Sequence, residues 1–238
     1  MALYHNHQYL YETFQCLRNS LELLAAWGCR GFNCSAESLA TIQSWSDPAQ
    51  PVNEVQTLPR IKADLGECTR CSLCRQRTHI VFGEGASEAR LVFVGEGPGF
   101  EEDQQGRPFV GAAGRLLTRI IAAMHLTREQ VYICNVVKCR PPENRNPVAD
   151  EIAACLPFLE RQLTALKPEV ICALGAVATS ALLGRSVSVT QLRGRFYDYH
   201  GIKLIPTFHP AYLLRNPEAK RDVWEDMKKI MALLDIPL

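Results

Sequence analysis

Four cysteines have the side-chain type and spacing of a metal or cluster site. Cys68 and Cys71 form a C-x2-C pair, whereas Cys139 and Cys155 are single residues much further along the chain. Thiolates are soft ligands, and two cysteines three positions apart can supply one edge of a tetrahedral array that remote residues complete. Such a site would exist only after folding has brought these segments together.

Cys74 extends the pair to C-x2-C-x2-C, which matches the start of a bacterial ferredoxin motif. The fourth cysteine of that motif is missing, because position 78 is threonine. From spacing alone, an iron–sulfur cluster, a zinc site and unliganded core cysteines all stay open. Cys134 and Cys172 lie inside apolar runs, so they are predicted to be core residues.

A glycine-rich segment, GEGPG at 95–99, follows an apolar run. It is neither G-x-G-x-x-G nor a Walker motif, but its glycines would let a ligand approach backbone N–H groups closely. Phe109 could stack on a planar ring, and Asn135 offers a donor and an acceptor to an amide-like edge. Together these residues suit a heterocyclic base. Taken singly, Phe109 is better explained as a core aromatic, and Asn135 as a strand-end cap.

The segment 207–217, TFHPAYLLRNP, combines a histidine with apolar and basic residues. His209 directly follows an apolar run and could point its imidazole into a crevice, although a lone histidine is often only structural. Proteins that distort duplex DNA push an apolar wedge into the base stack and hold phosphates with arginine. Leu213, Leu214 and Arg215 have that combination.

The elements that must position these residues alternate between strand and helix. Short apolar runs predict strands at 90–96, 131–135, 169–175 and 203–208, with helices near 112–125, 148–166, 175–184 and 217–235. This alternation indicates an α/β fold with a parallel sheet covered on both faces. Ligands of such sheets bind beyond the carboxyl ends of the strands, so the segments above are expected to converge there.

The N-terminal quarter has a different character. Helical spacing predicts helices over 7–27 and 36–46, followed by a polar stretch with two prolines. We therefore expect an N-terminal helical extension (1–44), a linker (45–57) and a main domain (58–238). Residues 1–58 hold two basic and five acidic side chains, which leaves the rest mildly basic and compatible with a nucleic-acid surface.

Composition narrows the setting. With 238 residues and 47% hydrophobic side chains, the chain can bury a sizeable core. No apolar run reaches the roughly 18 residues of a membrane span, and the N-terminus lacks the pattern of a secretory signal. We expect a cytoplasmic protein without a membrane partner, in which ten cysteines argue for ligation rather than for a disulfide framework.

Over about residues 58–235, the chain resembles the family 4 uracil-DNA glycosylases, the iron–sulfur branch of the uracil-DNA glycosylase superfamily. The resemblance rests on CTRCSL, RTHIVFGEG, GEGPGFEEDQQGRPFVGAAGRLL, NVVKCRPPENRNP, the lone Cys155 and HPAYLLRNP. It implies a three-layer α/β/α domain with a four-stranded parallel sheet. It also implies a [4Fe–4S] cluster on Cys68, Cys71, Cys139 and Cys155, with Cys74 left out.

The resemblance further implies a role for each residue near the crevice. Uracil would stack on Phe109 and meet the backbone at Glu96 and Gly97, while Asn135 reads its edge. Glu102 would help to exclude the methyl group of thymine. His209 would stabilise the charge that develops on uracil O2, and Leu213 would fill the gap left by the flipped nucleotide.

Two departures from related enzymes bear on the mechanism. Classical family 1 enzymes carry an aspartate where this chain has Gly97, so the group that activates water is open among Asn144, Glu102 and Asp103. A related branch traps uracil-DNA through a histidine in an inserted loop. This chain reads through as PPENRNP without an insertion, which favours ordinary turnover.

The predicted function is therefore a monomeric, monofunctional glycosylase that releases uracil from single- and double-stranded DNA. The alternative is a non-catalytic iron–sulfur or zinc protein that binds nucleic acid or senses redox state. A third reading is a hydrolase of a nucleotide-sugar or cofactor that uses the same pocket.

Overall fold

The computed structural model describes residues 56–237 of the 238-residue chain. The predicted helices over 7–27 and 36–46 lie outside the described residues, as does the predicted linker up to residue 55. The proposed domain boundaries therefore stay predictions. Among residues 56–237, no helix combines the length and the apolar character that crossing a bilayer requires.

The described residues form one six-stranded sheet with the strand order β1-β3-β2-β4-β6-β5. The four central strands, β3, β2, β4 and β6, are parallel, while β1 and β5 pair antiparallel at the two edges. The strands are β1 (Glu84–Gly85), β2 (Leu91–Gly95), β3 (Tyr132–Asn135), β4 (Val170–Leu174), β5 (Tyr197–Tyr199) and β6 (Ile202–Thr207). The four predicted strands are thus confirmed, and the expectation of a four-stranded sheet is corrected to a mixed sheet of six.

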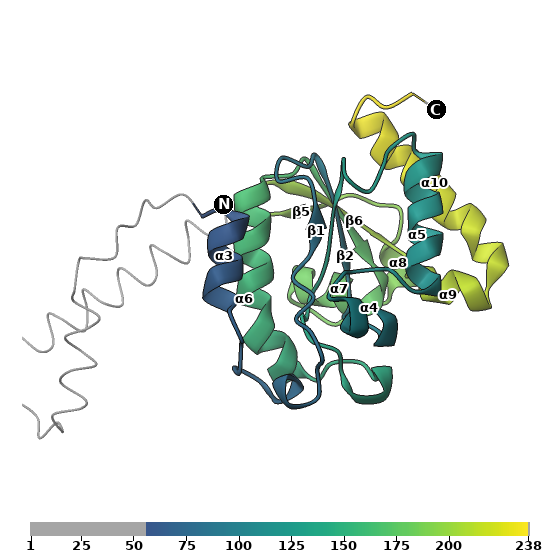
Figure 1. Ribbon diagram of the computed structural model, residues 1–238. Helices are drawn as coiled ribbons and strands as arrows, with labels where there is room; N and C mark the ends of the chain where they lie inside the picture. Colours follow the sequence, from purple (N-terminus) through teal and green to yellow (C-terminus); the bar gives the residue numbers. More distant parts are fainter. Residues whose placement is uncertain (1–55, 238) are drawn as a thin grey trace, which may run out of the picture. The chain divides into compact units, whose positions relative to one another are not determined.

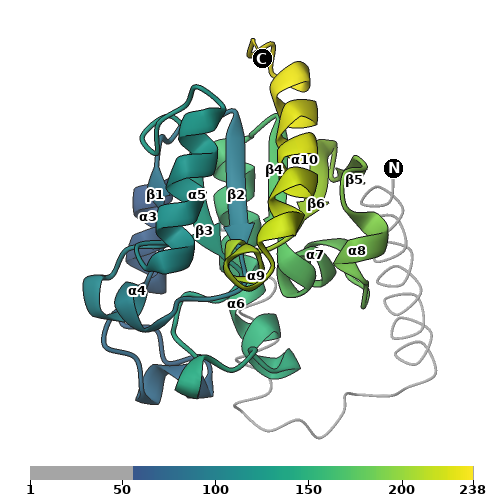
Figure 2. The same cartoon turned by 90° about the vertical axis from the view of Figure 1, so that its right-hand side faces the viewer.

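Helices lie on both faces of this sheet (Figures 1 and 2). The α-helices are α3 (Leu58–Leu65), α4 (Phe100–Gln105), α5 (Ala112–Ala123), α6 (Ala149–Leu166), α7 (Gly175–Leu183), α8 (Val189–Leu192), α9 (Pro210–Arg215) and α10 (Lys220–Leu233). Three short 3-10 helices join them, η1 (Ser72–Arg75), η2 (Pro142–Asn144) and η3 (Pro217–Ala219).

The three layers follow from the alternation of side chains along the parallel strands. Leu91 and Phe93 of β2 pack in one core cluster with α5, α9 and α10. Val92 and Val94 of the same strand point to the opposite face, where they pack in a second cluster with α6 and α7. Both faces are apolar because both are covered, which confirms the predicted α/β/α layering.

The carboxyl ends of the parallel strands present the functional segments at one end of the sheet. After β2 ends at Gly95, the chain enters α4, and after β6 ends at Thr207, it enters α9. The pairing of β2 with β3 continues past the strands, because Val136 donates its backbone N–H to the carbonyl of Gly95. The glycine-rich segment and the residues after β3 are therefore held side by side.

Candidate functional site

A small cavity, here called the inner cavity, lies at this end of the sheet. It has a volume of about 100 Å³ and is lined by Gly97, Gly99, Glu102, Phe109, Ala113, Asn135 and His209. Pockets for drug-sized ligands measure roughly 300–1,000 Å³, so this cavity has room for little more than one ring. The predicted convergence of Phe109, Asn135 and His209 on one cavity is present in the structure.

Gly95 makes room for two of these side chains. A Cβ atom on Gly95 would lie 2.4 Å from Oδ1 of Asn135 and 2.5 Å from Cζ of Phe109. Asn135 is only 1% exposed, and its Oδ1 has no hydrogen-bond partner. A buried amide oxygen without a partner costs free energy, so the cavity is matched to a ligand with a hydrogen-bond donor.

The ring of Phe109 is presented by a backbone that is held from two directions. Phe109 has a φ of 53°, a left-handed conformation that is strained for an aromatic residue. Arg128, which is paired with Glu84, donates to the carbonyls of Pro108 and Phe109 at 2.8 and 3.0 Å. The Phe109 ring centroid lies 5.6 Å from that of His209, with 34° between the ring planes.

Glu102 holds the other side of the same loop. One carboxylate oxygen accepts from the backbone N–H groups of Val110 and Gly111, both at 2.9 Å, and the second accepts from Gly99 at 3.1 Å. These bonds join the glycine-rich segment to the Phe109 loop. Glu102 therefore lines the inner cavity with both oxygens already engaged, which limits its capacity to accept a proton from water.

His209 is positioned at the junction of β6 and α9. It is the N-cap of α9, and its Nδ1 accepts from the backbone N–H of Ala211 at 3.1 Å. A neutral imidazole with an accepting Nδ1 carries its proton on Nε2. Burial lowers the pKa of His209 to about 4, and the charge of Arg215 adds to this lowering, while Glu102 opposes it. The ring is thus a neutral hydrogen-bond donor at pH 7.

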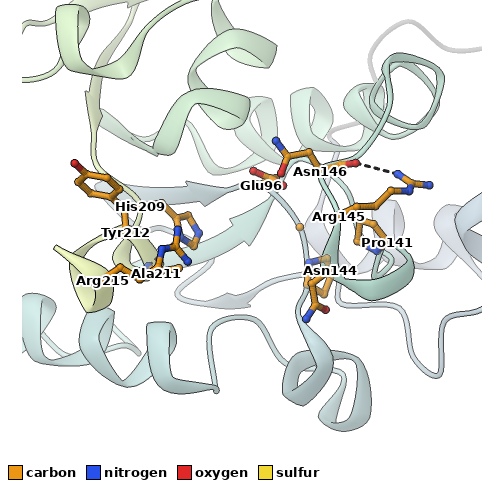
Figure 3. Close-up of a pocket in the computed structure, with 11 residues that line it drawn as sticks. Glu96, Pro141, Asn144, Arg145, Asn146, His209, Ala211, Tyr212 and Arg215 are labelled. Atoms are coloured by element: carbon orange, nitrogen blue, oxygen red, sulfur yellow. Dashed lines mark hydrogen bonds between the residues drawn. The ribbon is translucent and has the colours of Figure 1, made fainter.

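A wider hollow, here called the outer groove, adjoins the inner cavity and shares Gly97 and His209 with it. Its volume is about 320 Å³, and its further lining residues are Glu96, Pro98, Pro141, Asn144, Arg145, Asn146, Ala211, Tyr212 and Arg215. Figure 3 shows His209, Tyr212 and Arg215 on one side and Pro141, Asn144 and Arg145 on the other. Arginines and an aromatic ring beside a base-sized cavity are typical of a nucleic-acid surface.

The three residues considered for water activation lie in different environments. Asn144 is in the outer groove rather than in the inner cavity, and its Oδ1 accepts from Nε of Arg140 at 2.7 Å. Asp103 is buried and accepts from the backbone N–H groups of Thr78 and His79 at 2.8 and 3.3 Å, so it holds a loop. Glu102 is engaged as described above.

Glu96 is the carboxylate that the sequence analysis did not consider for this role. It is half-buried in the outer groove, and among residues 56–237 no hydrogen bond or ion pair engages its side-chain carboxylate. Burial raises its pKa. The sequence does not show that this carboxylate lies in the same groove as His209, because His209 follows a different strand, β6.

The expected position of Leu213 is wrong. Its side chain is 0% exposed and packs in the core cluster with α5 and α10, so it does not project toward a DNA surface. Leu214 and Tyr212, which flank it on α9, are 44% and 39% exposed. Neighbouring positions on a helix face different directions, and the three-residue run Tyr-Leu-Leu does not show which one faces the core.

The four predicted cysteines come together at a second place. Cys68 and Cys71 lie in the segment between α3 and η1, Cys139 follows β3, and Cys155 is in α6. Each thiol interacts electrostatically with others of the set, Cys139 with Cys71 and Cys155, and Cys155 with Cys68 and Cys71. Figure 1 shows the segment after α3 running beside the start of α6.

The surroundings of these sulfurs fit a negatively charged cluster. The backbone N–H of Lys138 donates to Sγ of Cys155 at 3.3 Å, Arg77 donates to Sγ of Cys139 at 3.5 Å, and Arg70 to Sγ of Cys68 at 3.5 Å. Hydrogen bonds to sulfur are a main means by which proteins tune iron–sulfur clusters. In the described part of the chain, no group of three or more potential ligands has the arrangement of a single metal-ion site.

Three of these cysteines, as free thiols, have raised pKa values. Burial raises the pKa values of Cys71 and Cys155, and it raises that of Cys139 to about 11 despite the opposing charge of Arg77. Thiolates are the species that ligate metals, so cluster formation would release protons here. Cys134 and Cys172 are fully buried in β3 and β4, as predicted for core residues.

An ion pair that the sequence analysis missed links the cysteine segment to the outer groove. Glu151, at the start of α6, binds Arg145 through two hydrogen bonds of 2.8 Å and also accepts from Ser72 at 2.9 Å. Arg145 lowers the pKa of Glu151 to about 2. Arg145 lines the groove and Ser72 follows Cys71, so the two sites share one polar network.

The chain is similar in sequence to known proteins. A model of the uracil DNA glycosylase superfamily matches residues 82–228. A type-4 uracil-DNA glycosylase of Thermotoga maritima is 54% identical, over 71% of this chain and 90% of the relative. Proteins with the same description from Sulfurisphaera tokodaii and Archaeoglobus fulgidus are 44% and 40% identical, over 77% and 75% of this chain and 87% and 94% of the relatives.

Proposed function

The chain belongs to the type-4 branch of the uracil-DNA glycosylase superfamily, and we propose that it removes uracil from DNA by hydrolysing the N-glycosidic bond. The observation that carries this proposal is the unpartnered Oδ1 of Asn135 in a cavity of about 100 Å³. Uracil has a ring N–H next to a carbonyl, which complements an amide that offers one acceptor and one donor.

The recognition of uracil involves stacking and the edge of the base. The base lies against Phe109, its edge meets Asn135, and its carbonyl approaches the backbone at Glu96 and Gly97. Because the Phe109 loop fixes the position of the Phe109 ring, a bound base has little space for an added methyl group. Thymine therefore fits poorly. Glu102 contributes to this exclusion by fixing the loop rather than by touching the methyl group itself.

In the bond-breaking step, the C1′–N1 bond breaks and its electron pair leaves with the base. The resulting negative charge on uracil O2 is stabilised by a hydrogen bond from Nε2–H of His209. The low pKa of His209 keeps its imidazole neutral, with the proton on Nε2. A water molecule then adds its oxygen to C1′, and its proton finally reaches the uracil. The products are free uracil and an abasic site.

Glu96 is the residue that we propose as the general base that activates the attacking water. Its free carboxylate lies where the outer groove meets the inner cavity, whereas Glu102 and Asp103 are engaged by backbone N–H groups. A raised pKa favours general-base catalysis, because a stronger base accepts a proton more readily near neutral pH. Asn144 is then left to orient the DNA.

The outer groove would hold the DNA strand beside the flipped nucleotide. Arg145 and Arg215 face phosphates from opposite sides, and Leu214 and Tyr212 replace Leu213 as the apolar residues that enter the gap. The lining of both hollows comes from one chain, so we propose a monomer that acts on single- and double-stranded DNA. A DNA substrate also agrees with the expected cytoplasmic setting.

Cys68, Cys71, Cys139 and Cys155 would hold the [4Fe–4S] cluster, whose contribution is to tie the cysteine segment, the end of β3 and α6 together. The reaction itself is assigned to residues of the two hollows. The cluster is therefore a structural element in this proposal.

The experiment is an excision assay on oligonucleotides with U·G, U·A, single-stranded U, hypoxanthine and T·G, followed by alkaline cleavage. We expect cleavage at uracil and none at thymine. Asn135→Ala should lower the rate by about 10²-fold or more, because the edge of the base loses its partners. Intact uracil oligonucleotides after incubation with the cluster-loaded protein would contradict the function, and full activity of Asn135→Ala would contradict the site. A preference for free nucleosides over DNA would favour the small-molecule hydrolase.

A further inference from the structure

Lys138 is an unusual residue in this domain, because its side chain is 0% exposed. Its Nζ donates a hydrogen bond of 2.7 Å to the backbone carbonyl of Asn135. No carboxylate lies within ion-pair distance of it among residues 56–237. Lysine is almost never fully buried unless its charge is balanced, since an ammonium loses its hydration inside a protein. Something other than aspartate or glutamate must compensate this charge.

The groups that face Lys138 include two thiols. Its backbone N–H lies 3.3 Å from Sγ of Cys155, and the charge of its ammonium acts on the sulfur atoms of Cys155 and Cys134. Cys155 belongs to the proposed cluster site, whereas Cys134 is a core residue of β3. A cluster held by four thiolates would carry net negative charge, and Cys155, one of its proposed ligands, is a sulfur on which the charge of this ammonium acts.

The same lysine is tied to the uracil pocket. Asn135 ends β3 and lines the inner cavity, while Cys139, four residues later, is a proposed cluster ligand. Between them, Val136 and Val137 donate their backbone N–H groups to the carbonyls of Gly95 and Glu96. The hydrogen bond from Lys138 Nζ to the Asn135 carbonyl joins the two ends of segment 135–138 through a buried side chain.

We infer that Lys138 is the built-in counter-charge of the iron–sulfur cluster and a positioning residue for Asn135. This inference rests on the proposed cluster. The cluster compensates a buried ammonium that no carboxylate among residues 56–237 balances, and that ammonium in turn holds the strand end that carries the base-reading amide. The cluster would then support the uracil pocket through one lysine side chain, in addition to holding its own loops.

The test uses Lys138→Met, which keeps the length and bulk of the side chain and removes its charge. Lys229→Met is the matched control, because Lys229 Nζ also donates 2.7 Å to a backbone carbonyl, that of Gly194, which is remote in sequence from the four cysteines. Each full-length protein is prepared with its cluster, and its reduction potential is measured by protein-film voltammetry. Thermal unfolding is then recorded before and after removal of the cluster with a chelator and an oxidant.

We expect Lys138→Met to shift the reduction potential to more negative values, because a nearby positive charge favours the reduced and more negative cluster. Removal of the cluster should lower the melting temperature of Lys138→Met less than that of the wild type, since only the wild type is left with an uncompensated ammonium. Uracil excision should fall about fivefold from the loss of one hydrogen bond. Lys229→Met should match the wild type in potential and in excision.

An unchanged potential together with an equal loss of stability on cluster removal would overturn the inference. If the methionine variant does not fold, Lys138→Gln is measured in its place, because it retains a donor and lacks the charge. If Lys138→Met and Lys138→Gln both fold without the cluster but not with it, the result would support the role of Lys138 as counter-charge. If neither variant folds, with or without the cluster, the inference would be overturned. A wild-type protein that never acquires iron and sulfide would instead contradict the proposed cofactor, which separates the two failures.

Discussion

The inner cavity and the cysteine site are built in opposite ways. The inner cavity lies at the ends of β2, β3 and β6, and backbone N–H groups and the Arg128 guanidinium hold its loops in place. The cysteine site is assembled from two irregular segments and helix α6, its thiols have no mutual bonds, and burial raises the pKa values of Cys71, Cys139 and Cys155. The first site is complete before its ligand arrives, whereas the second would gain its main connections from the proposed cluster.

The largest effect is expected where the ligand itself provides the structure. Cys155→Ser removes one proposed cluster ligand, and we expect the free energy of unfolding to fall by more than about 4 kcal/mol, as in losses of a metal site. Visible absorbance and chemical denaturation measure this. Cys172→Ala is the control, because it is a buried cysteine outside the set and should retain the colour. A coloured Cys155→Ser protein of normal stability would show that the ligand set is wrong.

In the outer groove beside the inner cavity, a single change should affect the reaction and leave the fold intact. Glu96→Gln removes the proposed base, and we expect single-turnover uracil excision to fall about 10²- to 10⁴-fold with an unchanged melting temperature. The control is Glu101→Gln, an exposed carboxylate that pairs with Arg115 outside the cavity. Equal excision rates for the two variants would return the assignment to Asn144.

A third change asks whether the cavity really is held by its own backbone. Glu102→Gln cannot accept all three backbone N–H groups, because one of its terminal atoms becomes a donor. We expect a loss of about 1–3 kcal/mol in unfolding free energy and weaker discrimination between uracil and thymine. Both are measurable by denaturation and by T·G cleavage. Wild-type stability in this variant would mean that the loop does not depend on the carboxylate.

The last prediction concerns pH and involves no effect on the protein at neutral pH. His209 should stay neutral down to about pH 4, as NMR of its imidazole would show. Because this pKa is lower in the folded protein than in the unfolded chain, the stability of the protein depends on pH. The unfolded state binds the proton near pH 6.5 and the folded state only near 4, so stability falls as pH drops from 6.5 to 4 and is level below that. A His209→Asn variant should lack this part of the slope. An imidazole that titrates above pH 6 would contradict the neutral donor.

The central layer of the fold could be predicted from the sequence because its strands are long enough to show an apolar run. The edge strands β1 and β5 could not, since two or three residues carry no periodic pattern. The positions of Asn135 and His209 followed from a general rule on strand ends. The function of Glu102 as an acceptor for backbone N–H groups did not, because its partners at Val110 and Gly111 are joined to it only by the folded loop.

The prediction for Leu213 is wrong and the sequence yields no prediction for Lys138, and the reason is similar in both cases. Both lie in segments that look exposed and polar in the sequence, yet both side chains are fully buried. A helical position next to an exposed neighbour gives no sign of its own direction. A lysine before a cysteine looks like a surface residue until the burial of its side chain and its hydrogen bond to the Asn135 carbonyl are known.

Gly95 has an effect out of proportion to its size. With no side chain there, Asn135 and Phe109 can occupy the volume that any other residue would claim. One methyl group added beneath the cavity would block entry of a flipped nucleotide, while Arg145 and Arg215 would still grip the phosphates of the strand. Gly95→Ala would thus produce a protein that still binds DNA but cannot accept a flipped uracil and excise it.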